Sequence, residues 1–384
     1  MKCQRDKFQL QNKYTYLNCA YMSPLSKKVE KAGVRGIKGK RKPWKTKAAD
    51  FFRDSETVRS LFAEIIDCPE PNRIVTVPSV SYGMANVARN LPRSSGEILI
   101  VDEQFPSNAY PWLSLRNDPI KVTVVKRPQR GESWTQQIIE HMSKDTIMLA
   151  IGNVHWADGT LFDLKALRKA TRDHGAILVI DGTQSVGALP ISVREVEPDA
   201  LVCAGYKWLF GPYSTGYAYY GPTFDQGTPV EENWINRKGA EHFGGLVTYT
   251  DEYAPGALRY EVGEHSNFVM MPMMIAALKQ VRNWDPGEIQ AYCRELTEPL
   301  IDAAIDMGFY VAPQAQRAHH LLGLYMPDQL PVATVEKQLH QNRINVSVRG
   351  HAMRISPNVY NDQRDIDKLI KTLKEAVDKS VVVA

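Results

Sequence analysis

Five apolar runs in the middle of the chain constrain its fold more than any other feature. Nearly every position in these runs is apolar, whereas a strand with one wet face would alternate apolar and polar residues. Helical patterns separate several of the runs, for example residues 164–175, where Gly175 is placed to end a helix. The order of strand, helix and strand predicts βαβ units in a mostly parallel, buried sheet. The runs cover residues 97–106, 120–127, 146–155, 175–184 and 199–207.

The pattern changes after about residue 222. Residues 224–256 are polar and rich in glycine, which is typical of loops, and two long helical patterns follow from about residue 264. The chain has 384 residues, enough for two hydrophobic cores. We therefore expect a large α/β domain over residues 25–260. The segments 1–24 and 261–384 are expected to form a small α+β domain.

Composition excludes several classes of partner. The net charge is only +4 and there is no long Lys/Arg run, so we expect no nucleic-acid partner. No stretch approaches 18 uninterrupted apolar residues and the first residues lack a signal-peptide core, so we expect no membrane partner. The five cysteines form no CxxC pair, which argues against a disulfide framework and against a metal site. A cytoplasmic location fits this cysteine usage.

Polar residues stand at the ends of two neighbouring predicted strands. Asp181 ends one run, Gln184 follows it, and Lys207 ends the next run. Ligands of open parallel sheets bind beyond the carboxyl ends of strands, so these side chains should converge. A lysine that can form a Schiff base, beside a carboxylate that keeps a pyridine nitrogen protonated, suits pyridoxal 5'-phosphate. In the alternative interpretation, Asp181 caps a turn and Lys207 lies on a solvated loop.

Residues 180–220 carry an Asp-x-x-Gln-Ser-x-Gly motif and a Lys-x-x-x-Gly-Pro loop. This combination resembles the class V aminotransferase family of fold-type I pyridoxal-phosphate enzymes, which includes cysteine desulfurases, kynureninases and isopenicillin N epimerases. The resemblance extends over nearly the whole chain and implies the fold-type I architecture, pyridoxal 5'-phosphate as the cofactor, and a homodimer. It implies that Asp181 pairs with the ring nitrogen and Gln184 donates to the phenolic oxygen. It also implies that Lys207 binds the cofactor covalently.

Two segments resemble the family's phosphate-binding and ring-stacking segments. Residues 78–91 resemble the phosphate-binding stretch at a helix N-terminus, so Val80 and Ser81 are expected to bind the phosphate. An ordinary serine N-cap would have the same geometry. Residues 102–112 place Phe105 where the family has a histidine over the ring. Stacking on an aromatic face would remain, but an acid or base would be lost.

Three other positions depart from the family pattern. In residues 153–160, His155 or Trp156 takes the place of an asparagine that approaches the cofactor oxygen, and a purely structural histidine is the alternative. Tyr206 precedes the lysine, and its hydroxyl could contact the phosphate. Glu264 replaces a threonine in the segment that reaches the partner subunit's phosphate, so a backbone contact is expected there.

The segment 346–362 resembles the family's C-terminal substrate motif. Arg354 would bind the carboxylate of an amino acid bidentately, and Arg349 would assist. The alternative is a surface strand with exposed arginines. The resemblance implies an enzyme that acts on an amino-acid substrate through an external aldimine, with Lys207 moving protons.

An aminotransferase is the favoured activity, with a C–S or C–C lyase or an amino-acid epimerase as alternatives within the same chemistry. A noncatalytic pyridoxal-phosphate-binding regulatory module is the alternative from a different class. The family's persulfide-forming cysteine lies shortly before the substrate arginine, but residues 308–353 contain no cysteine. We therefore do not expect a persulfide-forming desulfurase. Cys19 is the one cysteine for which this remains open, because its segment resembles a substrate-side loop.

Overall fold

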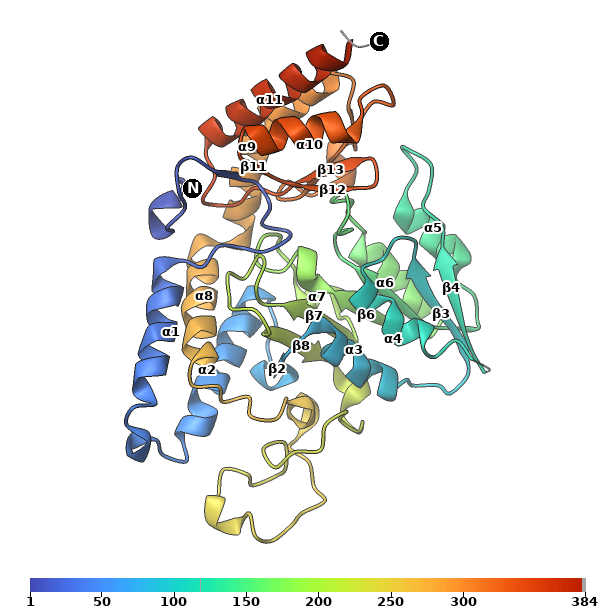
Figure 1. Cartoon of the computed structure of the whole chain (residues 1–384). Coiled ribbons are helices and arrows are strands. Elements are labelled where there is room, and N and C mark those ends of the chain that lie inside the picture. The colour runs from blue at the N-terminus through green and yellow to red at the C-terminus, as the bar shows by residue number, and fades with distance from the viewer. Residues whose placement is uncertain (118, 382–384) are drawn as a thin grey trace.

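The computed structural model describes residues 1–117 and 119–381. Within these residues, one sheet has seven strands in the order β2-β8-β7-β6-β5-β3-β4 (Figure 1). Neighbouring strands from β7 to β4 run parallel, and β8 runs antiparallel to both β2 and β7. The strands are β2 (Ile74–Val77), β3 (Gly96–Val101), β4 (Ile120–Val125), β5 (Thr146–Gly152), β6 (Ile177–Asp181), β7 (Ala200–Ala204) and β8 (Gly216–Tyr220).

All five predicted strands are present, so the expected α/β fold with a mostly parallel sheet is confirmed. The sequence interpretation missed β2 and β8, the two strands at the antiparallel edge of this sheet. Every residue of β6, β7 and β8 is buried. Alternate residues of the strands belong to two separate apolar cores, one on each face of the sheet. This two-sided burial explains why the runs are apolar at nearly every position.

Helices cover both faces of the sheet. The short α4 (Tyr110–Leu113) and α3 (Val80–Arg89) contribute to one core, and α5 (Trp134–His141), α6 (Leu164–Asp173) and α7 (Val193–Val196) contribute to the other. Helix α6 begins where the Asp163 carboxylate accepts the N–H of Ala166 at 3.0 Å. Beyond its last turn, Gly175 has a φ of +65°, so the predicted glycine stop is confirmed.

Three further helices lie side by side at one edge of the molecule (Figure 1). They are α1 (Lys27–Gly39), α2 (Asp50–Ile65) and α8 (Met270–Trp284). The predicted loop region 224–256 holds only short 3-10 turns, such as Phe243–Gly245, and extends away from the sheet in Figure 1. The loop prediction is confirmed. The proposed division between the two domains at residues 260 and 261 remains a proposal.

The C-terminal part forms a small α+β layer. Its antiparallel sheet has the order β12-β13-β10-β9, and β1 pairs with β11 in parallel. This pairing joins the N-terminal segment to the C-terminal part, as Figure 1 shows. The elements are β1 (Thr15–Tyr16), α9 (Pro286–Asp306), β9 (Tyr310–Val311), β10 (Leu322–Tyr325), α10 (Val332–Gln341), β11 (Ile344–Asn345), β12 (Ser347–Arg349), β13 (Ala352–Ile355) and α11 (Gln363–Val381). Over the described part of the chain, none of the helices has the length and apolar character needed to cross a bilayer.

Candidate active site

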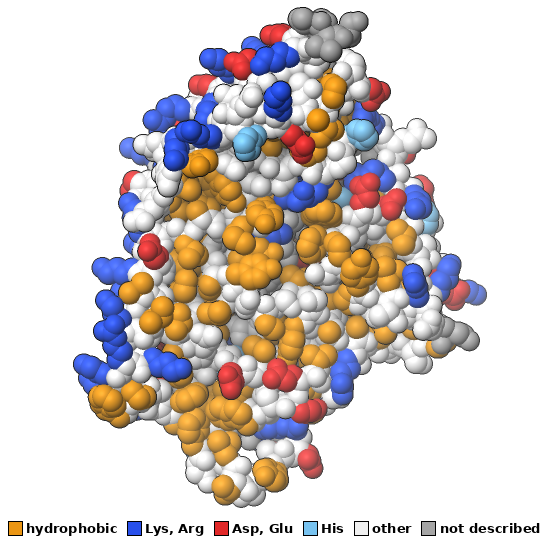
Figure 2. Space-filling view, viewed as in Figure 1, with side chains coloured by type: hydrophobic (Ala, Val, Ile, Leu, Met, Phe, Trp, Pro, Cys, Tyr) orange, Lys and Arg blue, Asp and Glu red, His pale blue; other side chains and the backbone are white. Residues whose placement is uncertain are grey.

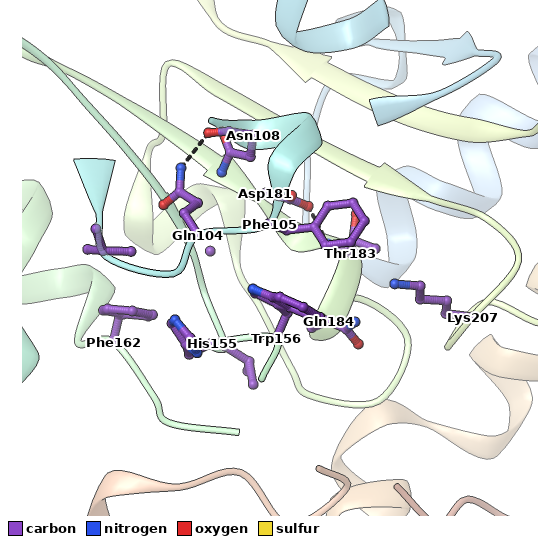
Figure 3. A pocket seen from close by; sticks show the side chains of 13 residues that line it. Gln104, Phe105, Asn108, His155, Trp156, Phe162, Asp181, Thr183, Gln184 and Lys207 are labelled. Carbon is purple, nitrogen blue, oxygen red and sulfur yellow. Dashed lines mark hydrogen bonds between the residues drawn. The ribbon is translucent and has the colours of Figure 1, made fainter. Parts of the chain in front are cut away.

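A pocket opens beyond the carboxyl ends of β3, β5, β6 and β7, where the fold predicts a ligand (Figure 3). Five of the predicted site residues contribute to it from different elements and loops: Phe105, His155, Asp181, Gln184 and Lys207. The remaining lining residues are Val101, Gln104, Asn108, Gly152, Val154, Trp156, Phe162 and Thr183. The fold therefore brings together residues that are far apart in the sequence.

Lys207 follows β7 and is buried, so the solvated-loop alternative is wrong. Its Nζ lies 5.4 Å from the centre of the Phe105 ring and 5.7 Å from that of Tyr206. Within residues 1–117 and 119–381, Nζ makes no hydrogen bond or ion pair. Burial, together with the nearby Arg354 guanidinium, lowers the pKa of Lys207 to about 8. Near neutral pH, a larger fraction of this amine is therefore neutral and nucleophilic than in an exposed lysine.

Asp181 ends β6 and is also buried. Its Oδ1 accepts the N–H of Thr183 at 3.0 Å, so the turn-capping alternative is correct for this oxygen. The other oxygen, Oδ2, has no hydrogen-bond donor in the described parts of the chain. Burial raises the pKa of Asp181, against the lowering effects of Thr183 and Lys207. A buried carboxylate with one oxygen unpaired is suited to a cationic N–H donor from a ligand.

The side chain of Gln184 is held on both ends of its amide. Its Oε1 accepts the indole N–H of Trp208 at 2.9 Å, and its Nε2 donates to the carbonyl of Ala20 at 3.2 Å. The backbone carbonyl of Gln184 accepts from His320 at 2.7 Å. Because Nε2 carries two hydrogens, one remains for a ligand oxygen. The predicted donation by Gln184 is compatible with this geometry.

Two aromatic side chains form walls of the pocket. Phe105 and Trp156 meet edge to face, with ring centroids 5.4 Å apart and an interplanar angle of 77° (Figure 3). The indole N–H of Trp156 donates to the carbonyl of Glu103 at 2.6 Å, which fixes the orientation of this ring. The arrangement offers an aromatic surface to a flat heteroaromatic ligand.

His155 lines the pocket but is engaged by the protein on all sides. Its Nδ1 lies 3.4 Å from Oδ1 of Asp158, and its Nε2 lies 3.4 Å from the carbonyl of Asp102. The ring stacks on Trp134, with centroids 6.0 Å apart and planes at 16°. These contacts support the structural interpretation of this histidine, whereas its neighbour Trp156 has a ring edge in the pocket.

Val80 and Ser81, the two residues predicted to bind the phosphate at a helix N-terminus, lie outside the pocket lining. Helix α3 begins at Val80, and the hydroxyl of Ser79 caps it by accepting the N–H of Tyr82 at 3.2 Å. The Ser79 and Ser81 hydroxyls lie 3.0 Å apart. As the first two residues of the helix, Val80 and Ser81 keep N–H groups without an acceptor in the described chain. The position suits an anion.

Tyr206 and Glu264 are the remaining predicted cofactor contacts. Tyr206 packs on Tyr213, with ring centroids 4.5 Å apart, and its carbonyl accepts two hydrogen bonds from Ser23. Glu264 is exposed at a φ of +55° and borders a separate hollow with Thr76 and Ser214. It therefore does not reach the pocket of its own chain. The predicted contact across a subunit boundary remains a prediction.

Arg354 lies on β13 with an exposed fraction of only 2%, so the exposed-strand alternative is wrong for this residue. Its Nη1 donates to the carbonyl of Trp156 at 2.8 Å and its Nη2 to Ser347 at 3.4 Å, while Nε lacks a partner within the described residues. Burial and the nearby Arg349 lower the pKa of Arg354 to about 10. Both guanidinium groups lie near the Trp156 ring, at 5.6 Å for Arg349 and 5.9 Å for Arg354.

Cys19 is the cysteine near this site, but it is buried behind the lysine. Its Sγ faces the backbone carbonyl of Lys207 at 3.8 Å and accepts from the amide of Asn358 at 3.4 Å. Burial raises the pKa of the Cys19 thiol to about 12. Cys203 and Cys293 are fully buried as well, as expected from their place in a strand and in a helix. A buried, protonated thiol is a poor nucleophile.

Sequence reasoning missed three polar residues of the pocket. Gln104 donates to the backbone carbonyl of Asn108, and Thr183 lies beside Asp181 (Figure 3). The Oε1 of Gln104 and the Nδ2 of Asn108 are buried without a hydrogen-bond partner among residues 1–117 and 119–381. All three belong to segments that already resemble family motifs, so their position within those motifs was the available signal.

Comparisons with known proteins identify the family of this chain. A model of the family described as Aminotransferase class-V matches residues 39–369. The chain is 23% identical to an uncharacterized aminotransferase of Bacillus subtilis over 83% of this chain and 82% of that protein. It is also 23% identical to a probable cysteine desulfurase of Vibrio cholerae, over 84% of this chain and 82% of the relative.

Solved structures share the fold at low sequence identity. The apo structure of a cysteine desulfurase from Thermococcus onnurineus superposes with a TM-score of 0.85 at 20% identity, covering 99% of both chains. A cystine C–S lyase, solved with its product cysteine persulfide, gives a TM-score of 0.83 at 19% identity, covering 95% of this chain and 97% of the other. At such identities the likeness extends to the fold alone.

Proposed function

The chain belongs to the class V aminotransferase family of pyridoxal-phosphate enzymes that act on amino acids, and from this premise we propose that it is an aminotransferase. The donor set of the pocket fits the cofactor. Lys207 offers an unpaired buried amine, Asp181 an unpaired carboxylate oxygen, and Phe105 an aromatic face. When bound, pyridoxal 5'-phosphate supplies an electron sink that stabilises negative charge at the substrate Cα.

The proposed cofactor contacts follow from these groups. Lys207 would hold the cofactor aldehyde covalently through Nζ, and the free Oδ2 of Asp181 would accept the pyridine N–H. One hydrogen of the Gln184 amide remains for the phenolic oxygen. The N–H groups of Val80 and Ser81 at the start of α3 would bind the phosphate. A regulatory module that only holds the cofactor would need the same cofactor contacts, but it would not need a buried arginine for a substrate carboxylate.

Arg354 would bind the α-carboxylate of the substrate. It is buried, has no acidic side chain within 4 Å in the described part of the chain, and keeps Nε unpaired. A substrate carboxylate would supply the missing acceptor and the missing countercharge. Arg349 lies near the same indole, 5.6 Å from its ring centre, and would add positive charge to this side of the pocket.

One observation favours amino transfer over epimerisation. The lining contains three side chains that titrate, namely Lys207, Asp181 and His155. Asp181 is expected at the cofactor and His155 is held by Asp158, Asp102 and Trp134. This leaves Lys207 as the base that moves a proton. Amino transfer moves a proton from Cα to a neighbouring carbon, which one base on one face of the substrate can do. Epimerisation removes the proton from one face of Cα and returns a proton to the other, so it needs proton exchange on both faces.

A carbon–sulfur lyase is the second candidate, because relatives are named cysteine desulfurases. Loss of sulfide from cysteine begins with the same proton removal by Lys207, so the pocket does not oppose it. The buried position of Cys19 opposes only the variant that forms a protein persulfide.

The test is a product assay on the purified, cofactor-loaded protein with a panel of amino acids and pyruvate or 2-oxoglutarate as acceptor. Amino transfer predicts a keto acid and a new amino acid in equal amounts, without ammonia or sulfide. Racemised substrate, or sulfide with pyruvate from cysteine, would contradict the proposal in favour of an epimerase or a lyase. Lys207→Ala should abolish the products in every case, which excludes a contaminating enzyme.

We further propose that the protein is a cytoplasmic homodimer. The five cysteines are free thiols, which suits a reducing compartment. Figure 2 shows many hydrophobic side chains on the face that is turned to the viewer. Exposed large side chains include Tyr249 at 96%, Val247 at 86% and Trp44 at 76%. Light scattering of the purified protein tests the dimer, and a mass of one chain would contradict it.

A further inference from the structure

Asp158 is a buried carboxylate in the loop between β5 and α6, directly behind the pocket wall. Its Oδ2 accepts from Arg127 and from the Tyr325 hydroxyl, each at 2.7 Å. Its Oδ1 accepts from the N–H and the hydroxyl of Thr160 at 3.0 and 2.8 Å and lies 3.4 Å from Nδ1 of His155. Burial opposes the charged form, but His155, Arg127 and Tyr325 together hold the pKa of Asp158 well below its usual range. These contacts therefore favour the charged form of the Asp158 carboxylate.

These contacts join three parts of the molecule. Arg127 follows β4 of the large sheet, and Tyr325 ends β10 of the small sheet. Asp158, in the loop between β5 and α6, contacts both side chains. The same loop is also held at Gly159, whose carbonyl accepts the N–H of Ala318 at 2.9 Å. Asp158 is thus the charged centre of a junction between the large sheet and the small C-terminal layer.

The junction leads directly to the substrate side of the pocket. Two residues before Asp158, the carbonyl of Trp156 accepts from Nη1 of Arg354 at 2.8 Å, and the indole donates to Glu103 at 2.6 Å. Arg127, which Asp158 holds, also pairs with the Glu103 carboxylate at 2.6 Å. The indole of Trp156 is therefore attached to a residue that Arg127 links to Asp158, and the Trp156 carbonyl lies two residues from Asp158 in the same loop. The Trp156 carbonyl is in turn the closest polar contact that orients the Arg354 guanidinium.

We propose that Asp158 is a positioning residue for substrate recognition, which fixes the Trp156 loop so that Arg354 presents its guanidinium to the carboxylate of an amino acid. The inference rests on the proposed role of Arg354. In Asp158→Asn, the negative charge is lost and one oxygen becomes an NH2 group that cannot accept, so either Arg127 and Tyr325 or the Thr160 N–H lose their acceptor. The loop then loses part of its attachment, and the Trp156 carbonyl no longer holds Arg354 in one orientation.

The experiment titrates the cofactor-loaded protein with L-alanine and, separately, with ethylamine, and follows the visible absorbance of the cofactor. Ethylamine has the same reacting amine but no carboxylate. In the wild type, L-alanine should bind more tightly than ethylamine. Asp158→Asn should reduce this ratio by about tenfold, because small misplacements of a binding group are costly. Tyr325→Phe removes one hydrogen bond to Asp158 and should reduce the ratio less, and it provides the test if Asp158→Asn does not fold.

Asp199 is the matched control. It accepts from Arg168 at 2.7 Å, from the N–H of Leu178 at 2.9 Å and from Thr223 at 2.6 Å, at the opposite end of β6 and β7. Asp199→Asn should lower stability but leave the ratio of L-alanine to ethylamine affinity unchanged. The double variant Asp158→Asn/Arg354→Lys should lose no more of this ratio than Arg354→Lys alone, because Asp158 acts through Arg354.

The outcomes separate the two claims. An equal loss of affinity for both ligands in Asp158→Asn, or an unchanged ratio in both Asp158→Asn and Tyr325→Phe, would overturn the positioning role. If the wild type does not distinguish L-alanine from ethylamine, or if Arg354→Lys leaves that distinction intact, then the proposed role of Arg354 is itself wrong. Additive losses in the double variant would show that Asp158 acts on the carboxylate by another route.

Discussion

At the scale of single residues, burial is the main cause of the lowered pKa of the Lys207 amine. Its pKa of about 8 lies below the ordinary 10.5, so the folded protein disfavours the protonated amine. Between these two values the unfolded chain binds more protons than the folded one. The lysine's contribution to the free energy of unfolding of the cofactor-free protein therefore rises with pH through this window and is flat below about 8.

The first prediction uses this lowered pKa. The rate at which cofactor-free protein binds pyridoxal phosphate covalently should rise roughly tenfold between pH 7 and pH 9 and then level off, because the amine becomes neutral near pH 8. Free Nα-acetyl-lysine under the same conditions should gain roughly 100-fold over this range, since its pKa stays near the ordinary value. Stopped-flow absorbance measures both rates. A protein that follows the free lysine would show that Lys207 is solvated or is not the reacting group.

Asp181 gives the second prediction. Asp181→Ala should still bind the cofactor covalently at Lys207, but turnover should fall by orders of magnitude, because nothing keeps the ring nitrogen protonated. Borohydride reduction followed by peptide mapping checks the attachment, and a coupled keto-acid assay checks turnover. Near-normal turnover, or a label on a lysine other than Lys207, would mean that the cofactor lies elsewhere.

Arg354 gives the third prediction. Arg354→Ala removes a charge-assisted pair to the substrate carboxylate, and buried pairs of this kind cost roughly 2–5 kcal/mol when one partner is truncated. The loss should appear in kcat/KM for amino acids and not for amines that lack the carboxylate. Arg349→Ala is the comparison, and we expect it to have the smaller effect because Arg349 is only half-buried. An equal loss for both substrate types would exclude Arg354 as the carboxylate ligand.

At the scale of elements, the loop between β5 and α6 must fit closely against the small sheet. Gly159 has a φ of +81°, and a Cβ at this position would lie 1.9 Å from the carbonyl oxygen of Leu321. Gly175 also has a positive φ, of +65°, but a Cβ there would meet no atom within 4 Å. A Cβ at Gly175 would therefore cause backbone strain alone, whereas a Cβ at Gly159 would also clash with Leu321.

The fourth prediction compares these glycines. Gly175→Ala should lower the free energy of unfolding by about 1–2 kcal/mol, the cost of a left-handed backbone with a Cβ. Gly159→Ala should cost clearly more, because the small sheet must also move away from the loop. Urea denaturation of both variants measures the difference. Equal losses would mean that the loop and the small sheet separate easily in solution.

At the scale of the whole molecule, the placement of the cysteines bears on whether the chain can form a protein persulfide. Cys3 is partly buried, and Cys19, Cys68, Cys203 and Cys293 are buried. A persulfide-forming enzyme needs a thiolate on a mobile loop that reaches the substrate sulfur. Burial raises the pKa of Cys19, the nearest thiol to the lysine, to about 12.

The fifth prediction is that no protein-bound persulfide forms when the cofactor-loaded protein is incubated with cysteine. Mass spectrometry of the intact protein detects the added sulfur, and a relative with a loop cysteine serves as the positive control. Persulfide on any of the five cysteines at the rate of turnover, lost when that cysteine becomes serine, would refute the claim. Free sulfide and pyruvate without a persulfide would favour the lyase candidate.

The sequence by itself determined the sheet and the chemical type of the site. Strands buried on both faces read as continuous apolar runs, and motif residues at the ends of such strands must meet at one edge of the sheet. Asp181, Gln184 and Lys207 could be predicted for this reason, whereas Phe105 was predicted only from the resemblance of residues 102–112 to the family. Strands β2 and β8 could not be predicted in this way, because β2 has only four residues and the run of β8, Gly-Tyr-Ala-Tyr-Tyr, is not a continuous aliphatic stretch.

Only the tertiary structure decided which side chains are unpaired and which are already occupied. Burial of Lys207 and Arg354 and the enclosure of Cys19 depend on segments that are far apart in the sequence, and burial controls the pKa of each group. The same holds for Asp158, whose partners Arg127 and Tyr325 come from two different sheets. A local pattern specifies its own backbone and the face it buries, whereas the environment of a charge is the sum of everything that folds around it.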